Sequence, residues 1–242
     1  MKRVMQDTKI VLLISLFICL FSFMGLGASA ETPLALESGQ LISNAFPDDA
    51  FRTYVCTEVL GRRVSRADVA FANAKFEDGD AEKIADCLYL DVTAILEIEN
   101  LKGIQYFTNM TTLYCAWCSN LKSLDVSGCR SLTSLYYRNT KIKKLDVTNC
   151  KNLYYLSCCS CENLEKLNVK GCTKLETLDC NTCNKLTNLD VRGCSSLKYL
   201  YSYSCNNLTS LDASGCEALT YLTCRYCSAL TNLNANGCSI IL

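Results

Sequence analysis

Apolar positions recur at a fixed short interval through the second half of the chain. From Thr108 to Cys238 the sequence divides into segments of eleven residues, with one of ten, and each full segment is apolar at its third and sixth positions. Two kinds of segment alternate, one reading LxxLxCxxC and the other LxxL[DN][VA]xxC. The repeating unit is therefore a coil of about 22 residues, present six times, and such self-similarity predicts a solenoid.

Each half coil predicts a short strand. The alternation around Leu-x-Cys and Leu-x-Val has a period of two residues, and it directs Leu175, Leu178, Cys180 and Cys183 inward. Stacked coils would pair these strands in parallel, roughly 4.8 Å apart. Each covered Leu, Ile or Val would contribute about 1.5–3 kcal/mol. The pattern is that of a leucine-rich repeat solenoid, with parallel β-rich coils and two nested repeats per coil.

The region before the repeats predicts a small α-helical cap. AFPDDAFRTYVCTEVLG, Ala45 to Gly61, predicts a helix with Pro47 at its first position and Gly61 as its stop, and 65–74 predicts a weaker one. We assign 31–95 to this cap, 96–107 to a first irregular repeat and 108–242 to six coils. The cap would cover the open edge of the first coil.

The first thirty residues predict an export signal. Lys2, Arg3 and Lys9 precede an apolar run over 10–26, and small residues end at Ala30. We expect cleavage near Ala30. The run is short for a membrane helix and no second candidate follows, so the mature chain is expected to lack a membrane span and to be secreted or held at the cell surface.

The amino-acid composition argues against several classes of function. Positive and negative charges balance and half of the residues are apolar, which disfavours nucleic acid as a partner. Histidine is absent, which removes Ser-His-Asp, Cys-His and histidine-ligated metal chemistry. We therefore expect a non-enzymatic protein without a cofactor.

The cysteines fall into columns one coil apart. The first column holds Cys118, Cys161, Cys183, Cys205 and Cys227, the second holds Cys129, Cys150, Cys172, Cys194, Cys216 and Cys238, and the third holds Cys115, Cys158, Cys180 and Cys224. Leucine-rich repeats usually place a buried Asn at such positions, and a thiol is a small buried hydrophobe with a weak donor. The columns therefore predict a structural frame.

Other uses of the cysteines and acids stay open as alternatives. The cysteines suit disulfides between neighbouring coils, zinc held by paired CxxC motifs, or a thioredoxin-like redox role. Asp125, Asp146, Asp190 and Asp212 form an outward column, interpreted as turn hydrogen bonding, with calcium binding as the alternative. A cysteine-rich thiol or metal-binding protein is thus the rival function.

Aromatic residues concentrate in one kind of half coil. The predicted aromatic wall comprises Tyr114, Trp117, Tyr136, Tyr155, Tyr199, Tyr201, Tyr203, Tyr221 and Tyr226. Tyr and Trp offer large contact area with a polar tip, which suits a protein or glycan ligand. The plainer interpretation is that these rings stack to stabilise parallel strands.

Three stretches carry a family resemblance. FPDDAFRTYV, LKGIQYFTNMTTLYC and the repeated LxxLDVSGC unit resemble secreted, internalin-like leucine-rich repeat proteins of Gram-positive anaerobes, with nested 21/22-residue repeats. The resemblance implies a secreted or cell-surface binding rod, with a role in adhesion to a host or another cell surface. The chain departs from it by lacking an LPxTG-type motif and a carboxy-terminal cap. We therefore expect a fragment or an exposed last coil.

Overall fold

The computed structural model describes residues 35–63, 71 and 73–239. The predicted signal peptide, most of the helix predicted over 65–74 and residues 240–242 lie outside these ranges. Within them, no helix is both long enough and apolar enough to cross a membrane.

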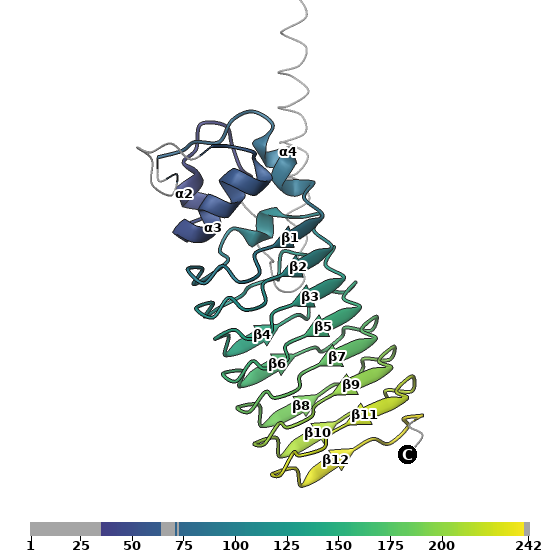
Figure 1. Cartoon of the computed structure of the whole chain (residues 1–242). Coiled ribbons are helices and arrows are strands. Elements are labelled where there is room, and N and C mark those ends of the chain that lie inside the picture. The colour runs from purple at the N-terminus through teal and green to yellow at the C-terminus, as the bar shows by residue number, and fades with distance from the viewer. Residues whose placement is uncertain (1–34, 64–70, 72, 240–242) are drawn as a thin grey trace, which may run out of the picture. The chain divides into compact units, whose positions relative to one another are not determined.

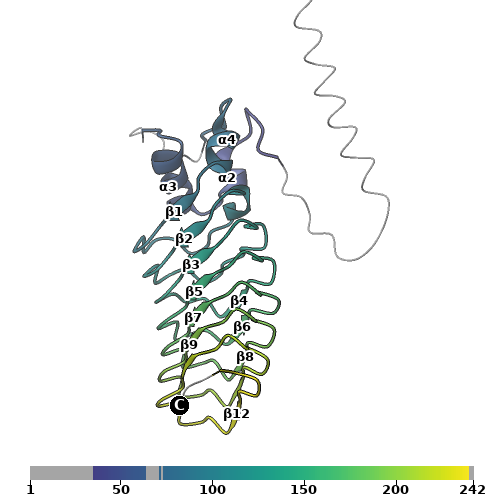
Figure 2. The same ribbon diagram turned by 90° about the vertical axis from the view of Figure 1, so that its right-hand side faces the viewer.

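The repeats form parallel sheets on two sides of a stack of coils (Figures 1 and 2). One side is a seven-stranded sheet, in the order β1 (Tyr89–Asp91), β2 (Thr112–Tyr114), β3 (Ser134–Tyr136), β5 (Tyr155–Ser157), β7 (Thr177–Asp179), β9 (Tyr199–Tyr201) and β11 (Tyr221–Thr223). On the other side, β4 (Lys144–Asp146) pairs with β6 (Lys166–Asn168), and β10 (Ser210–Asp212) lies between β8 (Asn188–Asp190) and β12 (Asn232–Asn234). We call these the large sheet and the small sheets.

Strand register confirms the predicted coil. Leu113 lies opposite Leu135, which lies opposite Leu156, so the register advances by 22 residues, or by 21 where one segment is shorter. The predicted leucine-rich repeat solenoid is therefore confirmed. The large sheet has one strand more than the six predicted coils, because β1 pairs with β2 and forms an earlier turn ahead of the repeat predicted over 96–107.

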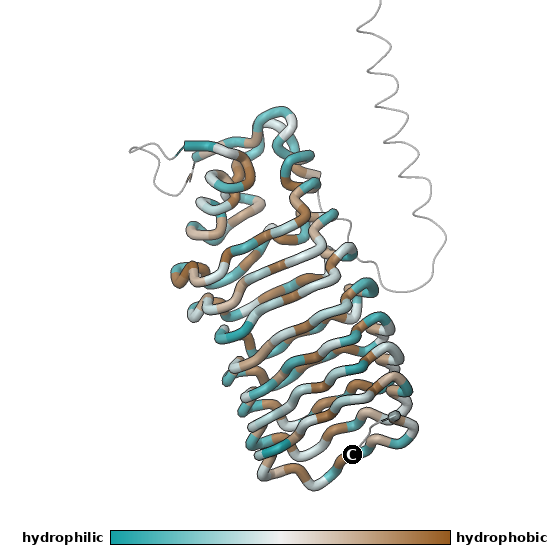
Figure 3. The backbone as a smooth tube through the Cα atoms, turned by 45° about the vertical axis from the view of Figure 1, so that its right-hand side comes forward, coloured by the Kyte–Doolittle hydropathy of each residue, from teal (hydrophilic) through white to brown (hydrophobic). Residues whose placement is uncertain are grey.

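The core runs along the inside of the coils. Leu175, Leu178, Cys180 and Cys183 are fully buried, which confirms the predicted inward pattern. In Figure 3, apolar and polar stretches alternate along each turn of the tube. Leucines of the last described strand are less buried than those before it. Leu211 of β10 is fully buried, whereas Leu233 of β12 is 47% exposed. The reason is that, among the described residues, β12 has a neighbouring strand on one side only. Each coil therefore depends on its neighbours for its apolar contacts.

Most half coils have a left-handed backbone position just before the column cysteine, or before the residue that takes the place of that cysteine. On the small-sheet side glycine usually occupies it, as at Gly193 (φ 80°). On the large-sheet side the position is taken by residues with side chains: Ala94, Trp117, Asn139, Ser160, Thr182, Ser204 and Tyr226. Left-handed backbone costs a residue with a Cβ atom about 1–2 kcal/mol, so the large-sheet turns are strained.

The amino-terminal cap is helical but more broken than predicted. It contains α2 (Ile42–Ala45), α3 (Asp49–Tyr54), the π-helical η1 (Val55–Val59) and α4 (Asp80–Ala85), and the short 3₁₀ helix η3 (Ile104–Tyr106) follows. Asp48 is the N-cap of α3, so the prediction that Pro47 opens the helix is wrong. Gly61, at φ 67°, follows the end of η1, which confirms it as the stop.

Asp48 joins the cap to the first coil. One carboxylate oxygen accepts from the Phe51 amide that starts α3 (3.0 Å), and the other accepts from the amides of Glu99 (2.9 Å) and Asn100 (3.1 Å). The Phe46 ring packs edge-on against Phe51, and a Cβ atom on Gly103 would lie 2.2 Å from the Phe46 ring. The cap is therefore held by a buried carboxylate and by close aromatic packing.

We predict that Asp48→Ala lowers the free energy of unfolding by about 2–4 kcal/mol, because it removes a helix cap and leaves buried amides without partners. Asp78→Ala, at an exposed position, should stay within about 0.5 kcal/mol of the unsubstituted protein. Urea unfolding measures both. Equal stabilities for the two variants would contradict this role for Asp48.

Candidate binding surface

The outward face of the large sheet carries two columns of side chains, one on each side of the central Leu of every strand. From β1 to β11 the first column reads Tyr89, Thr112, Ser134, Tyr155, Thr177, Tyr199 and Tyr221, and the second reads Asp91, Tyr114, Tyr136, Ser157, Asp179, Tyr201 and Thr223. We call the seven tyrosines of these columns the aromatic face. The strands of the small sheets carry no aromatic residue.

Six of the seven rings of the aromatic face form two groups, and Tyr199 makes no ring contact with another described residue. Tyr89, Tyr114, Tyr136 and Tyr155 make a continuous run, in which Tyr114 and Tyr136 are parallel at 4.3 Å and Tyr136 and Tyr155 lie 4.8 Å apart. Burial within this run raises the pKa of Tyr136 to about 12. Tyr201 and Tyr221 form the second group, at 5.3 Å. β7, with Thr177 and Asp179, separates the two groups.

Three predicted wall residues lie in the turns beyond the strands. Trp117 and Tyr226 occupy the strained left-handed position. Tyr203 lies one residue before Ser204, which occupies that position in its own coil. Tyr203 and Tyr226 pack edge to face at 5.2 Å, and Arg138 lies over the Trp117 ring at 5.5 Å. We call these three residues the turn aromatics. The predicted wall is thus divided between a sheet face and a turn rim.

The structure adds one tyrosine that the sequence analysis missed. Tyr89 on β1 is 55% exposed and contacts Tyr114 at 5.2 Å. It lies before the regular repeats, so the periodicity does not include it. The sequence nevertheless contains a signal, because Leu90 to Val92 repeats the LDV motif of later half coils, as at Leu145 to Val147.

The outward Asp and Asn column of the small-sheet half coils holds turns. In each, the side-chain Oδ1 accepts from the backbone amide two residues later, as for Asp125 and Ser127 (2.9 Å), and the same contact is made by Asp146, Asn168, Asp190, Asp212 and Asn234. These are Asx turns. The prediction of turn hydrogen bonding for this column is confirmed.

The column cysteines point inward and reach the preceding coil. Every thiol of the first two columns donates to a backbone carbonyl oxygen 24–26 residues earlier, at 2.9–3.7 Å, as Cys183 does to Cys158 and Cys194 to Val169. The cysteines from Cys115 to Cys238 are free thiols, and the Cys158 and Cys183 sulfur atoms lie 4.0 Å apart, about twice a disulfide bond length. These contacts tie consecutive coils together.

Burial suppresses the chemistry of these thiols. It raises the pKa of Cys129, Cys150 and Cys194 to about 12, and it also raises that of Cys115 well above its usual value. Thiol exchange needs the opposite shift, toward the thiolate. Cys205 is an exception, because a hydrogen bond with Cys180 lowers its pKa. Across the described part of the chain, no group of three or more Cys, Asp or Glu side chains has a geometry that could hold a metal ion.

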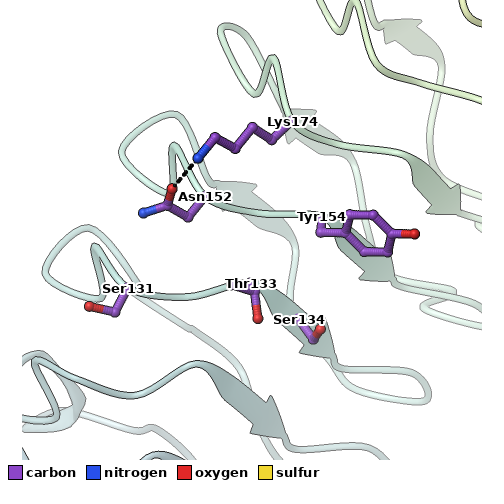
Figure 4. A pocket seen from close by; sticks show the side chains of 6 residues that line it. All are labelled: Ser131, Thr133, Ser134, Asn152, Tyr154 and Lys174. Carbon is purple, nitrogen blue, oxygen red and sulfur yellow. Dashed lines mark hydrogen bonds between the residues drawn. The ribbon is translucent and has the colours of Figure 1, made fainter.

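A shallow depression of about 510 Å³ lies beside the aromatic face (Figure 4). It is lined by Ser131, Thr133, Ser134, Asn152, Tyr154 and Lys174, which come from three consecutive coils. Lys174 donates to the side-chain oxygen of Asn152 at 2.8 Å. The depression combines one aromatic ring with hydroxyl, amide and ammonium groups.

Comparison with known proteins identifies the repeat type. Residues 77–200, just over half of the chain, match the family described as the endo-beta-N-acetylglucosaminidase EndoS LRR domain. A search of curated proteins gives no significant match.

Several solved structures share the coil architecture at low identity. The functional domain of InlJ from Listeria monocytogenes, described as including a cysteine ladder, is 20% identical with a TM-score of 0.45, over 84% of this chain and 63% of that one. The internalin InlF from L. monocytogenes is 16% identical with a TM-score of 0.47, over 86% and 74%. This chain therefore spans less than two thirds of the InlJ chain, and nothing about ligands follows from these similarities.

The buried thiols predict a loss of stability in alkali. An unfolded thiol loses its proton near pH 9, whereas folded Cys194 keeps it until about pH 12, so its contribution is complete below pH 9 and is lost as the pH rises toward 12. The free energy of unfolding should therefore fall by up to about 1.4 kcal/mol per pH unit for each such thiol.

Cys194→Ala provides the measurement. Urea unfolding between pH 9 and 11 should show a shallower pH dependence for this variant than for the unsubstituted protein, by the share of one thiol. Parallel curves for the two proteins would refute the burial-raised pKa.

Proposed function

Because the chain belongs to the family of EndoS-type leucine-rich repeat domains, we propose that it is a binding module of a secreted or cell-surface protein whose ligand is a protein. The ligand docks on the aromatic face and the turn aromatics. The predicted export signal over 1–30 supports a location outside the cell. The proposal gives the chain no catalytic role and no cofactor. Its biological setting is adhesion to a host or another cell surface.

One observation carries this proposal: aromatic side chains are displayed on one side of the coils only. Both sides repeat every coil and bury equivalent columns, mainly Leu and Cys on the large-sheet side and Leu, Val and Cys on the small-sheet side. Packing of the interior therefore places no tyrosine preferentially on the large sheet. Tyr199, Tyr203 and Tyr221 are each more than 40% exposed, and Tyr226 is 61% exposed. Tyr and Trp dominate the energetic centres of protein interfaces. A protein ligand accounts for this asymmetry.

The backbone conformation of the turns also favours the large-sheet side as the binding surface. On the small-sheet side glycine relieves the strain of the left-handed turn, whereas on the large-sheet side Trp117 and Tyr226 hold that position. Residues kept in strained backbone cluster at functional sites. Two of the seven strained positions thus display a large aromatic side chain beside the aromatic face.

Ring contacts favour a protein over a glycan on the sheet itself. Tyr136 lies between Tyr114 and Tyr155, so its two ring faces are turned to its neighbours, and it offers its edge and hydroxyl to a ligand. Sugars bind aromatic residues mainly through the ring face, whose negative charge attracts polarised C–H groups. Protein side chains and backbone groups bind well to edges and hydroxyls. The stacked run therefore fits a protein.

The rival thiol or metal function has less support. Most column thiols are buried, and burial raises the pKa of thiols such as Cys129 and Cys194, whereas a hydrogen bond with Cys180 lowers that of Cys205. The thiols of the first two columns already donate to carbonyl oxygens of the preceding coil, as Cys194 does. A redox or zinc-binding thiol must instead reach the thiolate form readily. The structural role of these cysteines between coils accounts for their recurrence, and no redox or metal chemistry is needed to explain it.

We predict that replacing Tyr199, Tyr201 and Tyr203 together by Ser weakens ligand binding tenfold or more. The fold should persist, because these residues are exposed or half-buried and their ring contacts with described residues are limited to Tyr201–Tyr221 and Tyr203–Tyr226. Each lost ring contact costs about 0.5–1.5 kcal/mol. The matched control replaces Asn188, Asp190 and Arg192 on the small-sheet side by Ser.

The probe is the labelled chain on parallel arrays of purified extracellular proteins and of glycans, followed by Kd measurements on the strongest binders. A protein binder that discriminates the tyrosine variant from the control supports the proposal. A ligand confined to the glycan array, or binding that both variants retain equally, would overturn it.

A further inference from the structure

The depression in Figure 4 is chemically unlike the aromatic face beside it. Its aromatic residue, Tyr154, lies two positions before the buried Leu of its strand, in a column that continues as Glu176 and Lys198 in the next two coils. Tyr154 is 49% exposed and makes no ring contact with any described residue. Both faces of this ring are free of the aromatic stacking that occupies Tyr136.

The Tyr154 hydroxyl lies next to the Glu176 carboxylate of the following coil, whose hydrogen-bonding interaction raises the pKa of Tyr154. Lys198 donates to Glu176 at 2.8 Å and balances its charge. The negative charge nearest to the ring is therefore already paired.

Polar groups around the ring retain unused hydrogen-bonding capacity. Lys174 uses one N–H on Asn152, keeps two more donors, and forms no ion pair with a described residue. The Ser134 hydroxyl makes no hydrogen bond within the described part of the chain. Ser131 and Thr133 donate to backbone carbonyl oxygens of the preceding coil, and their hydroxyl oxygens are still able to accept. The depression therefore offers donors, acceptors and one positive charge.

We propose that this depression binds a sugar that carries a carboxylate, with the pyranose ring against Tyr154 and the carboxylate at Lys174. A pyranose presents an apolar C–H face to an aromatic ring and hydroxyl groups around its edge, which matches this mixture of groups. The unpaired ammonium selects an acidic sugar. The volume of about 510 Å³ falls within the roughly 300–1,000 Å³ typical of small-ligand sites. Uronic and sialic acids share this chemistry.

This site goes beyond the proposed function. It uses none of the residues of the aromatic face or the turn aromatics, and it stands whether or not a protein binds there. Where both sites are used, the chain would contact a protein and its acidic glycan together.

The test titrates the full chain with three oligosaccharides by ligand-observed NMR: a hyaluronan tetrasaccharide for uronic acid, sialyllactose for sialic acid, and neutral lactose. At least one acidic sugar should bind, with a Kd on the order of 1 mM. Lactose should bind at least fivefold more weakly.

Variants locate the site. Tyr154→Ala should weaken binding of the acidic sugar tenfold or more, Tyr154→Phe should retain most of it because the ring remains, and Lys174→Gln should weaken it about fivefold. The matched control is Lys185→Gln, because Lys185 makes the same contact with Asn163 (3.1 Å) in a small-sheet half coil. This control and the Tyr199/Tyr201/Tyr203 variant should both bind normally, which separates this site from the proposed protein surface.

Three results would overturn the assignment. They are no binding of either acidic sugar at 10 mM or so, lactose binding as well as the acidic sugars, and equal losses in Lys174→Gln and Lys185→Gln. Unchanged thermal melting of each variant establishes that a loss of binding is not a loss of fold.

Discussion

The fold depends on a contact between consecutive coils in which a buried cysteine thiol donates to a backbone carbonyl oxygen of the coil before it. The contact occurs in both half coils and spans about 25 residues, as in Cys183 to Cys158 and Cys194 to Val169. In both examples the carbonyl oxygen also accepts from the backbone amide three residues later, so the thiol gives the turn a second hydrogen bond, one that comes from the next coil. A thiol at this position is small enough to pack among leucines and still supplies a donor, which explains why the cysteines follow the period of the chain.

This frame leaves the outward positions free to differ. The two sides of each coil bury equivalent Leu and Cys columns, yet one displays tyrosines and strained turn residues, and the other displays Lys, Asp and Asn in Asx turns. Salt bridges between coils, such as Lys122 with Glu99, lie on the exposed surface and contribute little to stability. This difference between the two sides follows from geometry. Inward side chains are constrained by packing against neighbouring coils, whereas outward side chains are constrained by a ligand or by solvent.

The sequence predicts most of the buried repeat structure and less of the arrangement of surface side chains. Strand positions, the inward columns and the Asx turns follow from periodicity, because each coil meets the same environment. The α4 helix and the early strand β1 fall outside the period, and Asp48 reaches across about fifty residues to Glu99 and Asn100, which no local pattern reveals. The division of the tyrosines by β7 follows from register, but the interaction of Tyr154 with Glu176 of the next coil does not. Surface geometry of this kind is set by side-chain conformations and not by spacing.

Cysteine reactivity tests the central claim most directly. Native protein is treated with a small alkylating reagent, with and without prior unfolding in the absence of a reductant, and each cysteine is quantified by mass spectrometry. The account predicts that Cys129, Cys150, Cys183 and Cys194, all fully buried, stay unmodified in the native state and react completely once the chain unfolds. Rapid modification of these residues in the native protein, or failure to react after unfolding because they are already joined in disulfides, would contradict it.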